Sequence, residues 1–268
     1  MKASKFLLIL LIAGLSFFSC KKSSSSTTDS TVTSADEAAS TIGASISANG
    51  YGLTAQIIDA IPVGTNGKLG LEPIHSLGNL EISKNLMVAG PSICGLTKDT
   101  IINRQNSSTS PIQFSFYLNY SFQVNCTQNT PSSLVFIDST SGTYSGPRIN
   151  YNGHSKGNMT VTNLPIADST LIFNGSYTRT GTSQSKVANK SNFTSTVTLT
   201  ITNLTIGKNS HFISGGTGTI TIVGASSAGK TFSYTGTVDF SNAKKLIVFI
   251  EGKKYFFDLF TGEELAVI

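Results

Sequence analysis

Charged residues are scarce in this chain. Of its 268 residues, only 12% are Asp, Glu, Lys or Arg, which is about half the usual share. Lys and Arg number 19 against 14 Asp and Glu, a formal net charge of +5. Nucleic-acid binding normally needs a concentrated basic face, so this weak excess argues against a nucleic-acid partner. Serine and threonine together supply 71 residues and therefore much of the polar surface.

Residue types that build catalytic and metal sites are also few. The three histidines, His75, His154 and His211, are scattered, and none belongs to an HExxH or HxH pattern. The three cysteines do not have zinc-site spacing, and no GxSxG nucleophile motif occurs. We therefore expect no cofactor, no metal and no enzyme activity. A Ser–His–Asp site assembled only in three dimensions stays open.

One segment, Gly224–Thr231, matches the P-loop pattern GxxxxGK[ST]. A P-loop holds phosphate because it opens a helix whose N-terminus faces the ligand. Here the following residues, TFSYTGTVDF, alternate between polar and apolar, which is the period of a strand. We therefore interpret the segment as a hairpin loop and expect no nucleotide partner.

The first 19 residues have the features of an export signal. Lys2 and Lys5 precede a 13-residue apolar core, Phe6–Phe18, which is too short to span a bilayer comfortably. The sequence FFSC that ends at Cys20 resembles the lipobox of bacterial lipoproteins. That resemblance implies cleavage before Cys20 and a diacylglyceryl group on its sulfur. An ordinary secretory peptide or an uncleaved anchor is the alternative.

The lipidated cysteine is followed by a polar stretch. Residues 20–34 are rich in serine and threonine and have no apolar periodicity, so we expect a flexible tether. If Cys20 carries lipid, the exported chain keeps one cysteine pair, Cys94 and Cys126, in an oxidising compartment. We predict a disulfide between them, which on the loop-entropy model stabilises by about 3–4 kcal/mol. Two separate buried thiols are the alternative.

Residues 35–93 are expected to form a helical and irregular segment that packs on a sheet. The sequence S-A-D-E at Ser34–Glu37 is a capping box, which predicts a helix start. Apolar residues continue at helical spacing to Ile61, with a break at Gly50–Gly52. Pro62 is predicted to end the second helix.

Residues 94–268 are expected to form an antiparallel β domain. In Ile112–Cys126 every even residue is apolar or aromatic and nearly every odd one is polar, which predicts a long strand with one buried face. Further strand patterns follow without helices between them, which predicts antiparallel hairpins. The fold class is therefore mainly β: long antiparallel strands in a meander, as a half-barrel or a sandwich, preceded by a short helical segment. The further strand candidates are Leu134–Ile137, Arg148–Asn152, Met159–Leu164, Leu171–Arg179, Phe193–Ile206, Thr217–Val223, Thr231–Phe240, Leu246–Glu251 and Tyr255–Phe260.

Several local sequences resemble a family of uncharacterised lipoproteins from the Bacteroidota. They are ADEAAS, GLTAQI, the CG…KDT segment at Cys94–Thr100, NC…P at Asn125–Pro131, GTYSGPR at Gly142–Arg148, and NGSYTRTG…SK…NKSNFTSTVTLTITNLT at Asn174–Thr205. The resemblance supports a location and implies no activity. Asp-Ser/Thr sites in the chain also resemble the O-glycosylation acceptor pattern of these bacteria. The candidate acceptors are Ser30, Thr100, Ser139 and Ser169.

Together these observations favour an outer-membrane lipoprotein, periplasmic or surface-facing, with a non-enzymatic structural or binding role at the cell envelope. The expected partners are the membrane, through the lipid anchor, and a glycan or an envelope protein. The alternative is a half-barrel carrier of lipids or other apolar ligands, in which the aromatic face of Ile112–Cys126 lines a cavity. A closed aromatic face favours the first function, and an open apolar cavity favours the second.

Overall fold

The computed structural model describes residues 33–66, 94–105, 110–164, 169–208, 210, 212–242 and 244–268. Among them, two helices precede eleven strands. The predictions for Cys20, Ser30, His75 and His211 lie outside the described residues. None of the described helices is long and apolar enough to cross a membrane. The elements are α1 (Ala35–Ile46), α2 (Leu53–Asn66), β1 (Thr97–Gln105), β2 (Gln113–Thr127), β3 (Thr130–Ser145), β4 (Ile149–Thr162), β5 (Thr170–Ser185), β6 (Asn192–Gly207), β7 (Ile213–Ser226), β8 (Thr231–Asn242), β9 (Lys245–Ile250), β10 (Lys253–Asp258) and β11 (Glu264–Val267).

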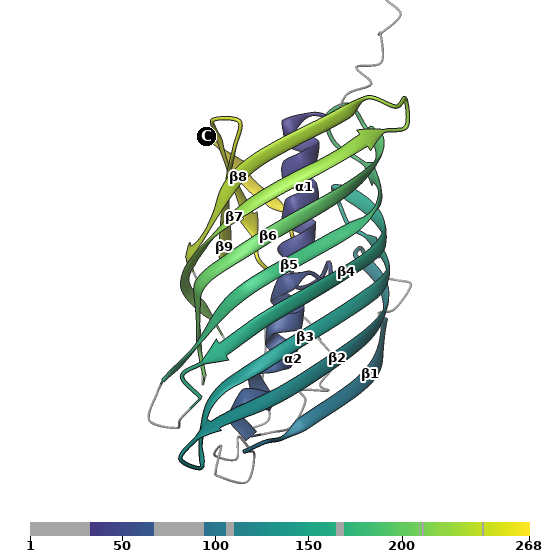
Figure 1. The fold of residues 1–268 in the computed structure, drawn as a ribbon. Helices are drawn as coiled ribbons and strands as arrows, with labels where there is room; N and C mark the ends of the chain where they lie inside the picture. Colours follow the sequence, from purple (N-terminus) through teal and green to yellow (C-terminus); the bar gives the residue numbers. More distant parts are fainter. Residues whose placement is uncertain are drawn as a thin grey trace, which may run out of the picture. The chain divides into compact units, whose positions relative to one another are not determined.

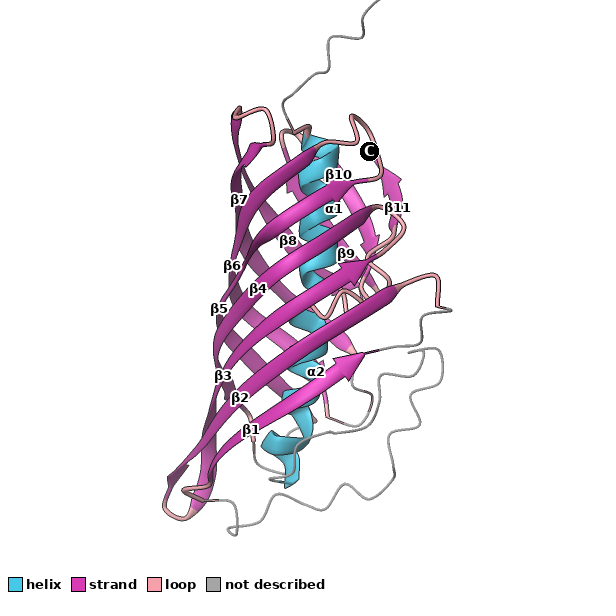
Figure 2. Cartoon of the chain, turned by 90° about the vertical axis from the view of Figure 1, so that its right-hand side faces the viewer, coloured by secondary structure: helices cyan, strands magenta, loops and turns pink. Residues whose placement is uncertain are grey.

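All eleven strands belong to one sheet. They lie in chain order from β1 to β11, and every neighbouring pair is antiparallel. The sheet curves around α1 and α2, which run along its concave side (Figures 1 and 2). The predicted meander of long antiparallel strands is confirmed. Because the strands form a single curved sheet, the arrangement is the half-barrel and not the sandwich.

Strand β2 occupies almost the residues predicted for the principal strand. Its inward side chains from Phe116 to Val124 are buried, and the side chains between them face out. Tyr117, the one large outward residue, is 47% exposed. Phe122 stacks on Phe136 of β3 with ring centroids 5.0 Å apart. The aromatic face is therefore part of a closed core.

Other strands are longer than predicted, or were not predicted. The candidates Arg148–Asn152 and Met159–Leu164 belong to the continuous strand β4. Its middle was missed because the inward residues there are Gly153, Ser155 and Gly157, which give no apolar alternation. Strands β1 and β11 were not predicted. The inward side chains of β1 are only half-buried. Its sequence has no continuous apolar face that would predict a strand.

The helices start as predicted but end differently. Both hydrogen bonds of the capping box are present: Glu37 N donates to Ser34 Oγ at 3.3 Å, and Ser34 N donates to Glu37 Oε2 at 2.8 Å. The prediction that Pro62 ends α2 is wrong, because α2 continues to Asn66. Ile61 and Val63 on either side of the proline are fully buried. Packing of this turn thus outweighs the backbone hydrogen bond that proline cannot make.

Helix α1 is made of small residues because it is enclosed on all sides. Ten of its twelve residues are buried, most of them Ala, Ser, Thr or Gly. At Gly43 a Cβ would lie 2.7 Å from the Phe257 ring of β10. The space inside the sheet therefore admits a thin helix and little more.

A line of inward-facing glycines crosses the sheet. Gly142, Gly153 and Gly181 are paired side by side on β3, β4 and β5, and Gly224 continues the line on β7 beyond Ser195. A Cβ at any of the four glycines would clash with a backbone carbonyl of the neighbouring strand and with the side chain of a Phe or Tyr residue. Glycine here allows strand bending and leaves room for the rings.

We predict that Gly181→Ala lowers the free energy of unfolding by about 1–3 kcal/mol, the usual cost of overpacking. The added methyl group would lie 2.7 Å from Tyr151 Cε2 and would also meet the Asn152 carbonyl oxygen. Gly215→Ala is the control, because nothing lies within 4 Å of its Cβ position. Urea denaturation of both variants makes the test, and equal stability of the two would contradict the role given to the glycine line.

Candidate functional site

The disulfide predicted from the sequence is present in the structure. Cys94 and Cys126 form a disulfide with their Cα atoms 5.6 Å apart. The predicted pair is therefore present, and the alternative of separate thiols is wrong. The bond ties the residues just before β1 to the end of β2, where Cys126 occupies an inward position.

The candidate glycosylation sites lie in different environments. Ser139 is exposed on the outer face of β3, and Ser169 is exposed just before β5. Thr100 on β1 is half-buried. Asp138, the acidic residue before Ser139, points inward and is buried. In the folded protein the Ser139 side chain is therefore accessible at this acceptor pattern, whereas the Asp138 side chain is not.

The P-loop-like segment Gly224–Thr231 is a hairpin turn between β7 and β8, as predicted. Ser226 N donates to the Lys230 carbonyl oxygen at 2.9 Å, which closes the turn. A strand follows it, so the loop has no helix N-terminus to present to a phosphate. Nor do the described residues contain a group of three or more His, Cys, Asp or Glu that could hold a metal ion.

A buried polar cluster joins α2 to the sheet. Asp59 of α2 accepts hydrogen bonds from the Tyr51 hydroxyl at 2.8 Å and from the Tyr120 hydroxyl at 2.7 Å. Arg104 of β1 lies 3.5 Å from the same carboxyl group. Burial raises the pKa of Asp59, and the Arg104 charge opposes that rise. These groups face one another and not an open cavity, so they serve packing.

Asp138 forms a second buried contact under the same helix. With the Gln56 amide oriented to satisfy its neighbours, its nitrogen donates to Asp138 Oδ2 at 2.9 Å and its oxygen accepts from Ser155 Oγ at 3.1 Å. Burial, with a smaller contribution from the charge of Asp59, raises the pKa of Asp138 to about 7, against a lowering effect of the Gly157 N–H. A raised pKa can mark a functional site, but here the carboxyl group is sealed between helix and sheet.

Arg179 of β5 binds the end of α1. Its Nη1 donates to the carbonyl oxygens of Ala44 at 2.9 Å and Gly50 at 3.1 Å. Its guanidinium carbon lies 3.8 Å from the centre of the Tyr151 ring. A cation at a helix C-terminus satisfies the last carbonyls and the helix dipole, so this buried charge is also structural.

The space between the helices and the sheet is nearly full. A small cavity of about 10 Å³ lies between α2, the neighbouring residues of β6 and β7, and the Leu259–Phe260 segment. That is room for about one water molecule.

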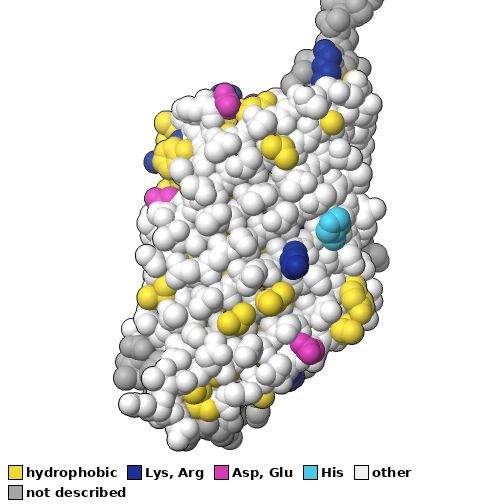
Figure 3. All heavy atoms as spheres, viewed as in Figure 1, with side chains coloured by type: hydrophobic (Ala, Val, Ile, Leu, Met, Phe, Trp, Pro, Cys, Tyr) yellow, Lys and Arg dark blue, Asp and Glu magenta, His cyan; other side chains and the backbone are white. Residues whose placement is uncertain are grey.

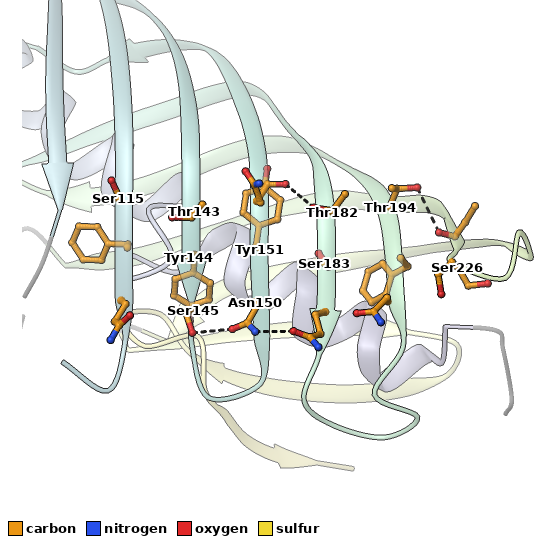
Figure 4. A pocket seen from close by; sticks show the side chains of 18 of the residues that line it. Ser115, Thr143, Tyr144, Ser145, Asn150, Tyr151, Thr182, Ser183, Thr194 and Ser226 are labelled. Atoms are coloured by element: carbon orange, nitrogen blue, oxygen red, sulfur yellow. Dashed lines mark hydrogen bonds between the residues drawn. The ribbon is translucent and has the colours of Figure 1, made fainter. Parts of the chain in front are cut away.

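The large cavity lies on the other face of the sheet. It is an open cleft of about 760 Å³, and no helix residue lines it. Most of its lining side chains are outward-facing residues of β2 to β7 near one end of each strand (Figure 4). Among the described residues that line it, none is charged. The lining is Gln105, Gln113, Phe114, Ser115, Thr143, Tyr144, Ser145, Asn150, Tyr151, Asn152, Thr182, Ser183, Gln184, Asn192, Phe193, Thr194, Ala225, Ser226 and Ser227.

Hydrogen bonds order one side of the cleft. Ser145 Oγ donates to Asn150 Oδ1 at 2.8 Å, and Asn150 Nδ2 donates to Gln184 Oε1 at 3.0 Å (Figure 4). These three residues come from three strands. Sequence reasoning missed them because only the strand register brings them together, and no local spacing signals it.

No protein-family model, no curated protein and no solved structure matches this chain. Of the polar groups described, the interior clusters hold the helices in place. The outer cleft is the feature that is both open and lined with hydrogen-bonding groups.

We predict that Asp138→Asn changes the pH dependence of stability. Because the pKa of Asp138 is raised from its ordinary value to about 7, the folded state binds a proton that the unfolded state releases. The stabilisation that the protonated Asp138 carboxyl group gives to the folded state is complete below about pH 4 and is lost as the pH rises to about 7. The wild type should lose up to about 4 kcal/mol more than the variant over this interval.

Urea unfolding at pH 4.5 and pH 7.5 measures this difference. Asp99→Asn, on the exposed side of edge strand β1, is the matched control and should keep the wild-type pH dependence. Parallel pH curves for the wild type and Asp138→Asn would show that Asp138 is ionised in the fold throughout.

Proposed function

We propose that the chain is a membrane-anchored exported lipoprotein with a non-enzymatic structural or binding role at the cell envelope. The observation that carries this proposal is the filled concave side of the sheet. Phe122, Phe136 and Tyr120 are completely buried, and the Tyr120 hydroxyl donates to Asp59 of α2 at 2.7 Å. The convex face remains available to a partner, and it carries the cleft.

The chemistry of the outer face supports a binding or structural role. Figure 3 shows few charged side chains on that face. On β6, the outward side chains Thr194, Thr198 and Thr200 are exposed. Hydroxyl groups both donate and accept hydrogen bonds, but without an activating base they are weak nucleophiles. This surface is suited to contact, not to covalent chemistry.

The alternative function, a carrier of lipids or other apolar ligands, has less support. A carrier needs an apolar cavity of several hundred Å³, whereas the cavity among the described residues inside the sheet measures about 10 Å³. The larger cleft is lined mainly by Ser, Thr, Asn and Gln.

The start of the folded body supports the anchoring part of the proposal. The helix begins at Ala35 with its capping box, directly after the Ser/Thr-rich stretch that follows Cys20. Thr33 is buried, and its carbonyl oxygen accepts from the Tyr234 hydroxyl at 2.8 Å. Thr33 is thus held against the sheet, and the stretch before it in the sequence has the composition of a spacer.

We predict that Cys20→Ala leaves an unprocessed precursor that takes up no labelled fatty acid. The thioether can form only on the cysteine sulfur, and processing at a lipobox follows lipidation. Metabolic labelling with radioactive palmitate and separation of membrane fractions make the measurement. Ser26→Ala, in the same stretch, should be labelled like the wild type. Labelling of Cys20→Ala at the wild-type level would remove the lipoprotein assignment.

A further inference from the structure

The cleft is bounded by two straight rows of side chains that run across the strands. The two rows lie two residues apart on each strand, so they are separated by about 6.8 Å. Between them the floor is made by the backbone of inward-facing residues such as Tyr144, Tyr151 and Ser183. One row is Ser115, Thr143, Asn152, Thr182, Thr194 and Ala225, and the other is Gln113, Ser145, Asn150, Gln184 and Asn192.

These rows make the cleft long and narrow. It crosses from β2 to β7, which is five strand-to-strand steps of about 4.8 Å, or about 24 Å in all. A site of this shape accommodates several units of an extended chain better than a single compact molecule. The ligand would lie at right angles to the strands.

The polar groups in the rows suit a ligand rich in hydroxyl groups. Amide and hydroxyl side chains each donate and accept, as a hydroxyl ligand does. Ser145 donates to Asn150, and Asn150 donates to the side-chain oxygen of Gln184. The Gln184 amide nitrogen is not used in these bonds, so it can donate to a ligand. Asn150 and Gln184 are thus oriented before a ligand arrives, which lowers the entropic cost of binding.

The lack of charged residues in the cleft lining disfavours ionic ligands. A charged ligand would lose water in the cleft, and none of the described residues that line it carries a charge. Lys186 lies beside the middle of the second row, against Ser145. Its Nζ lies 3.4 Å from Ser145 Oγ and already donates to the Gly146 carbonyl oxygen at 2.7 Å.

A peptide fits the cleft less well than a sugar chain. Peptides bind to sheets mainly by pairing with free backbone groups at an edge strand, whereas the floor strands are paired with a neighbour on both sides. The large side chains of the floor, Tyr144, Tyr151 and Phe193, are buried toward the core.

We propose that this cleft binds a neutral, linear glycan laid across strands β2–β7, with the Asn150–Gln184 pair as its central hydrogen-bonding contact. This inference rests on the proposed binding role and names its ligand class. It needs neither the lipid anchor nor the membrane, so each can be tested separately.

The test uses the full-length protein purified in detergent and titrated calorimetrically with hexasaccharides. The probes are uncharged linear glucan, mannan and galactan hexasaccharides, with a galacturonate hexasaccharide and an uncharged Gly/Ser hexapeptide for comparison. At least one neutral sugar should bind saturably. The double variant Asn150→Ala/Gln184→Ala should bind it at least tenfold more weakly.

Asn158→Ala is the matched control, because Asn158 is exposed on the same face of β4 but outside the cleft. It should bind like the wild type, and circular dichroism should show all variants folded. Absence of binding to every neutral hexasaccharide overturns the proposal. Stronger binding of galacturonate or of the peptide overturns it as well and reassigns the cleft. Sugar binding with a failed Cys20 labelling test would remove only the anchor.

Discussion

The fold depends on hydrogen-bonding partners for the terminal N–H and carbonyl groups of a helix that is buried inside a curved sheet. A buried helix leaves unpaired N–H groups at its start and unpaired carbonyls at its end, and ten of the twelve residues of α1 are buried. At the start, the Glu37 carboxyl group accepts from Ser34 N and from Ser191 N. At the end, Arg179 donates to the Ala44 carbonyl. Each end is thus matched by a charged group, one of them from the sheet.

The same constraint explains the interior residues of the sheet. Arg179 needs a flat partner for its guanidinium, which Tyr151 provides, and the Tyr151 ring needs the empty space above Gly181 and Gly153. The Tyr151 hydroxyl in turn lies 2.9 Å from the Thr180 carbonyl oxygen. The glycine line, the ring and the helix cap are therefore parts of one arrangement. A change in any one of them alters the others.

Local sequence pattern predicted the features that depend on neighbours in the chain. The alternation of β2, the capping box at Ser34 and the hairpin at Gly224–Thr231 are of this kind, and all three are present. The middle of β4 was missed because its inward positions are glycine and serine, whose fit is set by α2 and an aromatic ring. The cleft was missed for a related reason. Asn150 and Gln184 are 34 residues apart and become neighbours only through strand register.

The placement of α1 also sets the order in which the protein can assemble. The helix is made before any strand, yet its contacts with Arg179, Ser191 and Tyr255 lie 135, 154 and 219 residues later in the chain. Contacts so distant in sequence form slowly, so the centre of the molecule is synthesised first and enclosed last. During that interval α1 would stand uncovered, but it carries only two large apolar residues, Ile42 and Ile46. A helix of small residues thus fits the finished interior. It also exposes little apolar surface to other chains before the sheet closes over it.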